Sequence, residues 1–108
     1  MSARLRRLLT VAERSRRADF LKRLPWIKWL KEGRTCDGYR YNRMPVKAMH
    51  DSELKEKYRC KNPAHWKYKT LKKSWAEDGV YCMAHLYANC IWDMHEMARV
   101  ERWIQKHS

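Results

Sequence analysis

Two cysteine-containing segments, around residues 60 and 82–85, constrain this chain more than any other feature of its sequence. Cys60 stands just before an Asn-Pro turn signal. Cys82 and His85 stand three residues apart, where a glycine-led strand pattern gives way to a long helical pattern. Positions i and i+3 lie on one face of a helix, so this thiolate and this imidazole can bind the same metal ion. The two segments therefore indicate two halves of one metal site.

A tetrahedral zinc site requires one further ligand. Cys36 is the best candidate, because it lies in a turn-rich segment and has no place in a periodic core pattern. His50 is the alternative to Cys36, and His65 is the alternative next to Cys60. A structural site of this kind is closed, with no open position for water. We therefore predict a structural zinc site with the ligands Cys36, Cys60, Cys82 and His85.

The remaining cysteine, Cys90, is not expected to be a ligand. It lies eight residues after Cys82 on the same predicted helix, roughly 12 Å along the axis, and falls on the apolar stripe. The basic N-terminus lacks the apolar core of a signal peptide, and no stretch is apolar for long enough to span a bilayer. We therefore expect a cytoplasmic protein with reduced cysteines, a setting in which cysteine with histidine indicates a metal more often than a disulfide.

The charge of the chain is strongly positive and unevenly distributed. The 108 residues include 25 Lys and Arg and 12 Asp and Glu, a net charge of +13. The excess is +8 in residues 1–35, +5 in residues 36–81 and zero in residues 82–108. A positive field of this kind favours polyanions: nucleic acid first, an anionic membrane surface second and an acidic protein face third.

Residues 3–24 form a basic helical pattern in which leucines recur at helical spacing among arginines. Three interpretations stay open: a surface helix docked by its leucines, an arm that binds phosphates, and a helix that lies on a membrane surface. In the second interpretation, the predicted phosphate contacts of this segment are Arg4, Arg6, Arg7, Arg14, Arg16, Arg17 and Lys22.

Two shorter patterns follow. Residues 26–32 are predicted to form a short helix, because Pro25 precedes them and Gly33 follows them. Residues 64–81 alternate in the manner of a β-hairpin, with an Asp-Gly turn signal before the second strand. The lysines expected to form a second phosphate-binding patch on this hairpin are Lys67, Lys69, Lys72 and Lys73.

The C-terminal quarter of the chain predicts the main wall of the core. Residues 82–106 contain neither Gly nor Pro and carry a broad apolar stripe, so we expect one long helix. The elements together predict an α+β fold: a basic N-terminal helical segment in residues 1–33, then a zinc-stabilised hairpin and long helix in residues 34–108. This order resembles a treble clef, except that a treble clef begins with a tight Cys-x-x-Cys knuckle, whereas 23 residues separate Cys36 from Cys60.

The cysteine segments also resemble small Cys/His proteins encoded by phages of actinobacteria. In these, a Cys–Pro–Ala–aromatic segment is followed by a Tyr-Cys-x-x-His-Leu ending. The matching runs are residues 59–66, Arg-Cys-Lys-Asn-Pro-Ala-His-Trp, and residues 78–86, Asp-Gly-Val-Tyr-Cys-Met-Ala-His-Leu. The resemblance covers about a quarter of the chain. It implies a small zinc-binding phage protein, located in the host cytoplasm, and it implies no defined activity.

The sequence favours binding over catalysis. No carboxylate–histidine pair, glycine-rich phosphate loop or nucleophile elbow stands out, so we expect no enzyme. A metal-dependent nuclease that uses His50, His65 or Asp51 is the weaker possibility. The leading hypothesis is a non-enzymatic module that binds DNA or RNA through its basic helix and lysine-bearing hairpin, largely regardless of sequence. The alternative is an interaction protein that docks on a host machine, such as RNA polymerase or the ribosome, and modulates it.

Overall fold

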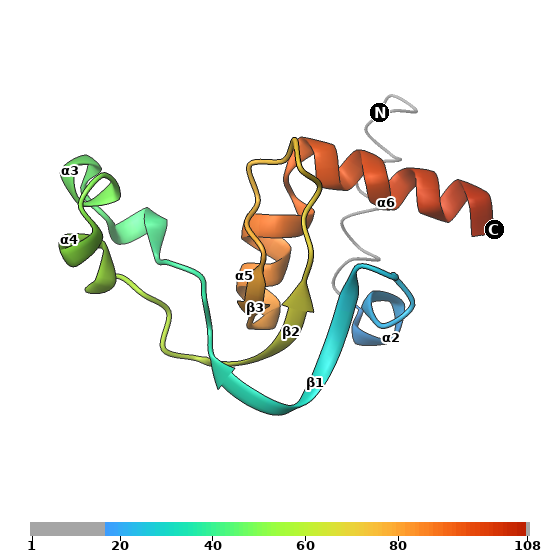
Figure 1. Ribbon diagram of the computed structural model, residues 1–108, viewed down its shortest axis with the longest axis horizontal. Coiled ribbons are helices and arrows are strands. Elements are labelled where there is room, and N and C mark those ends of the chain that lie inside the picture. The colour runs from blue at the N-terminus through green and yellow to red at the C-terminus, as the bar shows by residue number, and fades with distance from the viewer. Residues whose placement is uncertain (1–16, 108) are drawn as a thin grey trace.

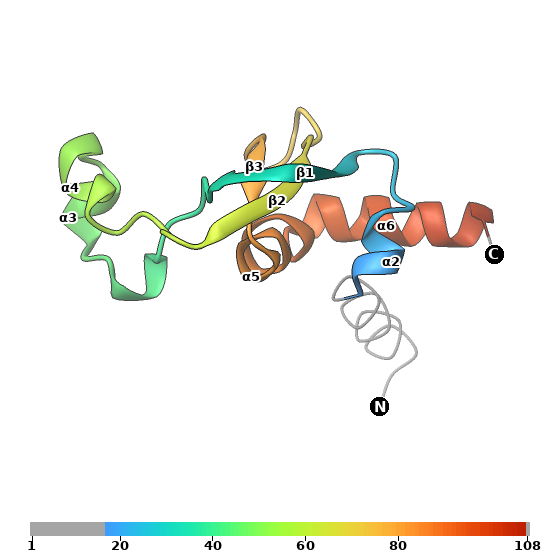
Figure 2. The same ribbon diagram turned by 90° about the horizontal axis from the view of Figure 1, so that it is seen from below.

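The computed structural model describes residues 17–107, which form a small α+β fold (Figure 1). Its three strands make one antiparallel sheet in the order β1-β2-β3. Helices α2, α5 and α6 all lie on the same side of this sheet (Figure 2). The elements in chain order are α2 (Ala18–Leu21), β1 (Ile27–Thr35), the 3-10 helix η1 (Tyr41–Arg43), α3 (Val46–Met49), α4 (Ser52–Glu56), β2 (Pro63–Tyr68), β3 (Gly79–Tyr81), α5 (Met83–His85), the π-helix η2 (Leu86–Ile91) and α6 (Met94–His107).

The core lies between the sheet and these helices. On β2, the buried side chains Ala64, Trp66 and Tyr68 alternate with the partly buried His65 and the exposed Lys67. This alternation is typical of a strand with one face on a core, and it confirms the hairpin predicted from the same residues. The helical side chains that complete the centre of the core, each almost fully buried, are Leu21, Leu86, Ile91 and Val100.

The helix predicted over residues 26–32 is wrong, because residues 27–32 lie in β1 and Trp26 lies in the turn before it. Ile27 pairs with Tyr68 of β2, so the pairing with a remote strand decides the structure of a segment whose local signals suited a helix. Gly33 lies within the strand rather than after a helix. A Cβ atom at this position would come within 2.7 Å of His65 Cε1, which explains the glycine by close packing. β1 also continues past residue 33, the predicted boundary between the N-terminal segment and the rest of the chain.

The connection between β2 and β3 is longer than a tight Asp-Gly turn. The strands are joined by residues 69–78, and the Asp-Gly pair stands at the end of this loop, with Gly79 opening β3. Asp78 closes the loop with its side chain, whose Oδ1 accepts a hydrogen bond of 2.7 Å from Thr70 N. The predicted turn residue therefore holds the two ends of a wider loop together.

The single helix predicted over residues 82–106 is divided into three parts. α5 passes into the π-helix η2, and α6 begins after a break at residues 92–93. Asp93 explains the restart, because its Oδ1 accepts hydrogen bonds from the backbone N–H groups of His95 and Glu96 at 2.9 and 3.4 Å. This is the arrangement of a helix N-cap, which satisfies donors that a helix start leaves unpaired. Sequence analysis missed the break, because an Asp inside an apolar-periodic pattern also suits the solvent face of a helix.

Glu96 is a fully buried carboxylate that ties α6 to the β2–β3 loop. Its Oε1 accepts hydrogen bonds from Leu71 N at 2.9 Å and from Thr70 Oγ1 at 3.2 Å. Its Oε2 lies 3.3 Å from Arg99 Nη1, and this guanidinium also stacks 4.0 Å from the ring centroid of Trp26. A buried charge held by this many partners is costly to disturb, because any lost partner leaves a polar group unsatisfied.

We expect Glu96→Gln to lower the free energy of unfolding by about 1–3 kcal/mol, because a neutral amide cannot replace the ion pair with Arg99. Urea denaturation followed by circular dichroism measures the change. Glu32→Gln is the matched control: Glu32 is exposed on β1, and its loss should change the stability by less than about 0.5 kcal/mol. Equal stabilities of the two variants would contradict the structural role of Glu96.

Candidate metal centre

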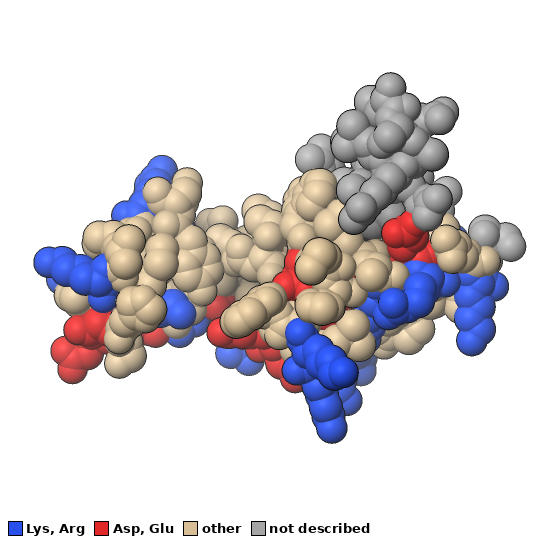
Figure 3. Space-filling view, turned by 90° about the horizontal axis from the view of Figure 1, so that it is seen from above, with Lys and Arg blue, Asp and Glu red and all other residues tan. Residues whose placement is uncertain are grey.

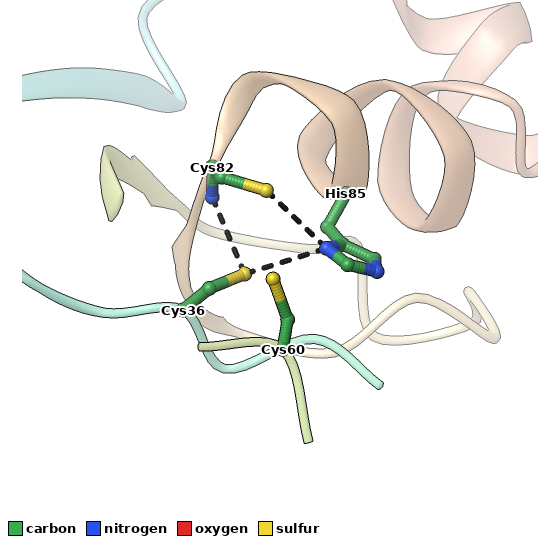
Figure 4. A group of neighbouring side chains, drawn as sticks. All are labelled: Cys36, Cys60, Cys82 and His85. Atoms are coloured by element: carbon green, nitrogen blue, oxygen red, sulfur yellow. Dashed lines mark hydrogen bonds between the residues drawn. The ribbon is translucent and has the colours of Figure 1, made fainter. Parts of the chain in front are cut away.

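The four predicted ligands come together at one point of the structure (Figure 4). One potential ligand atom from each of Cys36, Cys60, Cys82 and His85 lies within 4.8 Å of all the others. The three cysteines are buried and the histidine is partly buried. His85 Nδ1 lies 3.2 Å from Cys82 Sγ and 3.6 Å from Cys36 Sγ. The predicted cluster is therefore present, and it includes Cys36 from the turn-rich upstream segment.

Cys36 and Cys60 meet at the neck of a long excursion of the chain. Between them, η1, α3 and α4 form the lobe at the left of Figure 1. Across the neck, Cys36 N donates to Asn62 O at 3.2 Å and Cys60 N donates to Gly38 O at 2.9 Å. These backbone hydrogen bonds bring the two thiols together across the 23 intervening residues. The pairing replaces the short knuckle that the resemblance to a treble clef would have required.

Cys82 and His85 come from the junction of β3 and α5. Cys82 is the N-cap residue of α5 and His85 is its last residue, so one helical turn presents both side chains to the cluster. The imidazole packs closely on the neck: a Cβ atom at Gly38 would lie 2.6 Å from His85 Cγ. Any larger residue at position 38 would have to displace His85, and this close packing explains why the position is occupied by glycine.

Asp37 joins the neck to β3 beside the cluster. Its backbone N–H donates to Val80 O at 2.8 Å, and its Oδ2 accepts from Val80 N at 2.7 Å. Its Oδ1 lies 3.3 Å from Arg34 Nη2 and 3.8 Å from Arg59 Nη1. The residue thus positions the segment that carries Cys36. No pattern in the sequence singles out Asp37, because only the folded neck places this aspartate next to the edge of a strand.

The surroundings of the cluster suit a bound cation. Burial raises the pKa of the Cys36 thiol to about 12, which opposes a thiolate when no positive charge is nearby. Two backbone N–H groups act in the opposite direction, because Gly38 N and Cys82 N each lie 3.3 Å from Cys36 Sγ and donate to it. Burial lowers the pKa of His85, which favours the neutral imidazole that a metal ion binds. A metal ion would stabilise the thiolates that burial alone disfavours.

The donor set fits zinc. Three sulfurs and one imidazole nitrogen match the Cys₃His class of structural sites, in which Zn–S distances of about 2.3 Å place ligand atoms about 4 Å apart. The cluster could therefore hold a metal ion such as zinc, with Nδ1 as the histidine donor. Cys90 is fully buried and is not part of the group, as predicted. His65 is engaged elsewhere, with its Nδ1 2.8 Å from Leu30 O and its ring stacked on Trp29.

The predicted phosphate contacts are distributed over the surface. Among the described ones, Arg17 and Lys22 are exposed beside α2, and all four hairpin lysines are exposed on β2 or the loop after it. Sequence analysis missed Lys28, which is exposed on β1 directly opposite Lys67, because residues 26–32 were assigned to a helix. The predicted contacts that lie outside the described residues are Arg4, Arg6, Arg7, Arg14 and Arg16.

Comparisons with known proteins do not place the chain in a family: no family model, curated protein or solved structure matches it. The resemblance to phage Cys/His proteins therefore stays a prediction. Within residues 17–107, no helix combines the length and the apolar character that crossing a membrane requires. The four free cysteines are all buried, and the metal-type cluster remains the best-defined chemical feature of the described chain.

We expect the purified protein to contain one zinc ion per chain, and Cys82→Ser to abolish the stoichiometric metal. Replacement by Co²⁺ should give thiolate-to-metal charge-transfer absorption in the wild type, because the donor set contains three sulfurs. Inductively coupled plasma analysis and visible spectroscopy measure both effects. Cys90→Ala is the matched control, since it removes a buried thiol outside the cluster and should keep the full zinc content. A folded wild type that binds neither ion would contradict the assignment.

Proposed function

We propose that the protein is a non-enzymatic, zinc-stabilised nucleic-acid-binding protein of the small phage-encoded Cys/His type. Zinc at the four-residue cluster would fasten the neck of the α3–α4 lobe to the junction of β3 and α5. The resulting rigid body would present lysines and arginines to phosphates. The observation that carries the proposal is the contrast between carboxylates that the fold uses internally and lysines that it leaves on the surface.

Many of the carboxylates are engaged within the fold. Glu96 and Asp37 pair with arginines and with backbone N–H groups, as described above. Glu56 holds Arg59 through contacts of 2.8 and 2.9 Å. Asp51 caps α4 as its N-cap residue, accepting from the N–H groups of Glu53 and Leu54. Three of these carboxylates, Asp37, Glu56 and Glu96, therefore offset the charge of arginines rather than that of the exposed lysines.

The sheet carries a pair of like charges that a polyanion would relieve. Lys28 on β1 and Lys67 on β2 are partners in the antiparallel register, and both are exposed. Like charges directly opposite on neighbouring strands destabilise a sheet. A phosphate bound between the ammonium groups of Lys28 and Lys67 would replace repulsion by attraction. A further exposed lysine, Lys22, contacts β1 elsewhere, with its Nζ 5.1 Å from the ring centroid of Trp29.

Further positive groups extend along the molecule. Figure 3 shows Lys and Arg side chains in separate groups on the side viewed from above, one of them protruding where the β2–β3 loop lies. This loop contains the exposed Lys72 and Lys73. The described residues alone carry 20 Lys and Arg against 11 Asp and Glu. Spread-out cations of this kind suit a long charged strand better than a compact anion.

We expect the protein to bind oligonucleotides of mixed sequence with an affinity that falls at least about tenfold between 50 and 200 mM salt, because each phosphate contact releases counterions. Fluorescence anisotropy with labelled single-stranded and duplex DNA and RNA measures the affinity. Failure to bind any of these at low salt would rule out the proposed function.

The double variant Lys28→Gln, Lys67→Gln should weaken this binding and reduce the slope of log K against log[salt] by about 2, about one for each lost phosphate contact. Titrations at several salt concentrations measure the slope. The double variant Lys47→Gln, Lys106→Gln removes two exposed lysines from α3 and from the end of α6, and should change the slope less. Equal losses in both double variants would indicate a general charge effect and would contradict a specific role for the sheet.

A further inference from the structure

A pocket lined by aromatic side chains lies next to the neck that carries Cys36. Its volume is about 230 Å³. Its lining includes the polar residues Glu77 and Asn89 and four aromatic residues from three different parts of the chain. The aromatic residues are Tyr39, Tyr41, Trp75 and Tyr81. The predicted contacts did not include the three tyrosines, Glu77 or Asn89, because these residues come together only when the neck, the β2–β3 loop and the π-helix meet.

The rings divide into a buried floor and an exposed rim. Tyr81 is 4% exposed, and its hydroxyl donates a hydrogen bond of 2.8 Å to Glu77 O. Tyr41 is 40% exposed and Trp75 is 89% exposed, the largest exposure of any large apolar side chain in the described residues. A tryptophan left in water at the rim of an aromatic pocket contributes little to the core, and it is available to a ligand with a flat apolar face.

The charges around the pocket decide what kind of ligand fits. Aromatic pockets can bind organic cations through their ring faces. Here, however, Lys55 Nζ already lies 4.4 Å from the ring centroid of Tyr39 and 5.5 Å from that of Tyr41. Arg59 lies 4.8 Å from the centroid of Tyr39. These cations would repel a second positive group near Tyr39 and Tyr41. The lining also includes two carboxylates, Asp37, which pairs with Arg34 and Arg59, and Glu77. The part of the ligand that enters the pocket should therefore be neutral and flat, with its anionic part outside the pocket, towards Lys55.

A nucleotide has this combination. Its base is a neutral, flat ring system that can stack on exposed aromatic side chains, and its phosphate can pair with nearby cations such as Lys55. The edge of the base also matches the polar lining, because a carboxylate accepts hydrogen bonds from exocyclic amino groups and an Asn amide both donates and accepts. Glu77 and Asn89 supply these two groups at the pocket.

We infer that this pocket binds one unpaired base of a single-stranded nucleic acid, with Trp75 stacking on the base. The inference rests on the proposed nucleic-acid binding and extends it by naming the preferred form of the ligand. In a duplex the bases are stacked and paired, so a duplex could contact the exposed lysines of the sheet and of the β2–β3 loop but could not place a base in the pocket. The protein should therefore bind single strands more tightly than duplexes of the same charge.

The test compares variants of Trp75 on three ligands by fluorescence anisotropy: a mixed-sequence single strand, the corresponding duplex, and a single strand made of abasic units. Trp75→Ala should weaken binding to the single strand by about 5- to 100-fold, the effect of losing one stacked base. Binding to the duplex and to the abasic strand should change less than twofold. Trp75→Phe should restore most of the lost affinity, because it replaces one aromatic face with another.

Trp92→Ala is the control, since Trp92 is also an exposed tryptophan, 41% accessible, and lies outside the pocket. It should leave binding to the single strand unchanged, and thermal melts should show that all variants are folded. Wild-type binding to every ligand with no effect of Trp75→Ala would overturn the base pocket and leave the proposed function standing. Absence of wild-type binding to any nucleic acid would instead overturn the proposed function, and the pocket assignment with it.

Discussion

The convergence of three thiols and one imidazole is the constraint on which the rest of this small structure depends. It joins three segments that are distant in sequence: the two sides of the neck and the start of α5. The α3–α4 lobe lies away from the sheet and its helices, and it connects to them through this neck (Figure 1). A cation held by the cluster would thus fix the lobe, the hairpin and the first helical turn with one set of bonds.

The sequence pattern could identify the four residues of the cluster but not the way in which the chain brings them together. Cys82 and His85 have a local relation, one helical turn, that spacing alone reveals. Cys36 and Cys60 have none, since their contact depends on backbone hydrogen bonds across the neck, between residues distant in sequence. Their prediction rested on chemistry: cysteines without a role in an apolar pattern are expected to share a metal. Nothing in the spacing could predict Gly38 or Asp37, whose roles exist only in the folded neck.

The errors in the predicted fold have the same physical origin. Pro25 and Gly33 flank residues 26–32 at positions that suit the ends of a helix, yet pairing with β2 makes residues 27–32 part of a strand. The C-terminal pattern is helical almost throughout, and only the capping by Asp93 reveals that one helix ends and another begins. In the first case, pairing with a remote strand determined the secondary structure against a weak local preference. In the second case, the side chain of one residue determined where the helix begins. The hairpin was predicted more accurately, because apolar and polar residues alternate in the sequence in the same way as buried and exposed side chains alternate along β2.

The placement of the pocket connects the cluster to the proposed binding surface. Asp37 and Gly38, which line the pocket, directly follow the ligand Cys36, and Asn89 lies on the π-helix that continues from His85. The wall that would meet a base is therefore built on the segments that the cluster holds. Trp75 comes from the β2–β3 loop, which Glu96 anchors to α6 through Thr70 and Leu71. An exposed ring can bind a base with little loss of entropy only if its support is rigid. The cluster and the buried Glu96 carboxylate are therefore the two features that we expect to hold the lining segments in place.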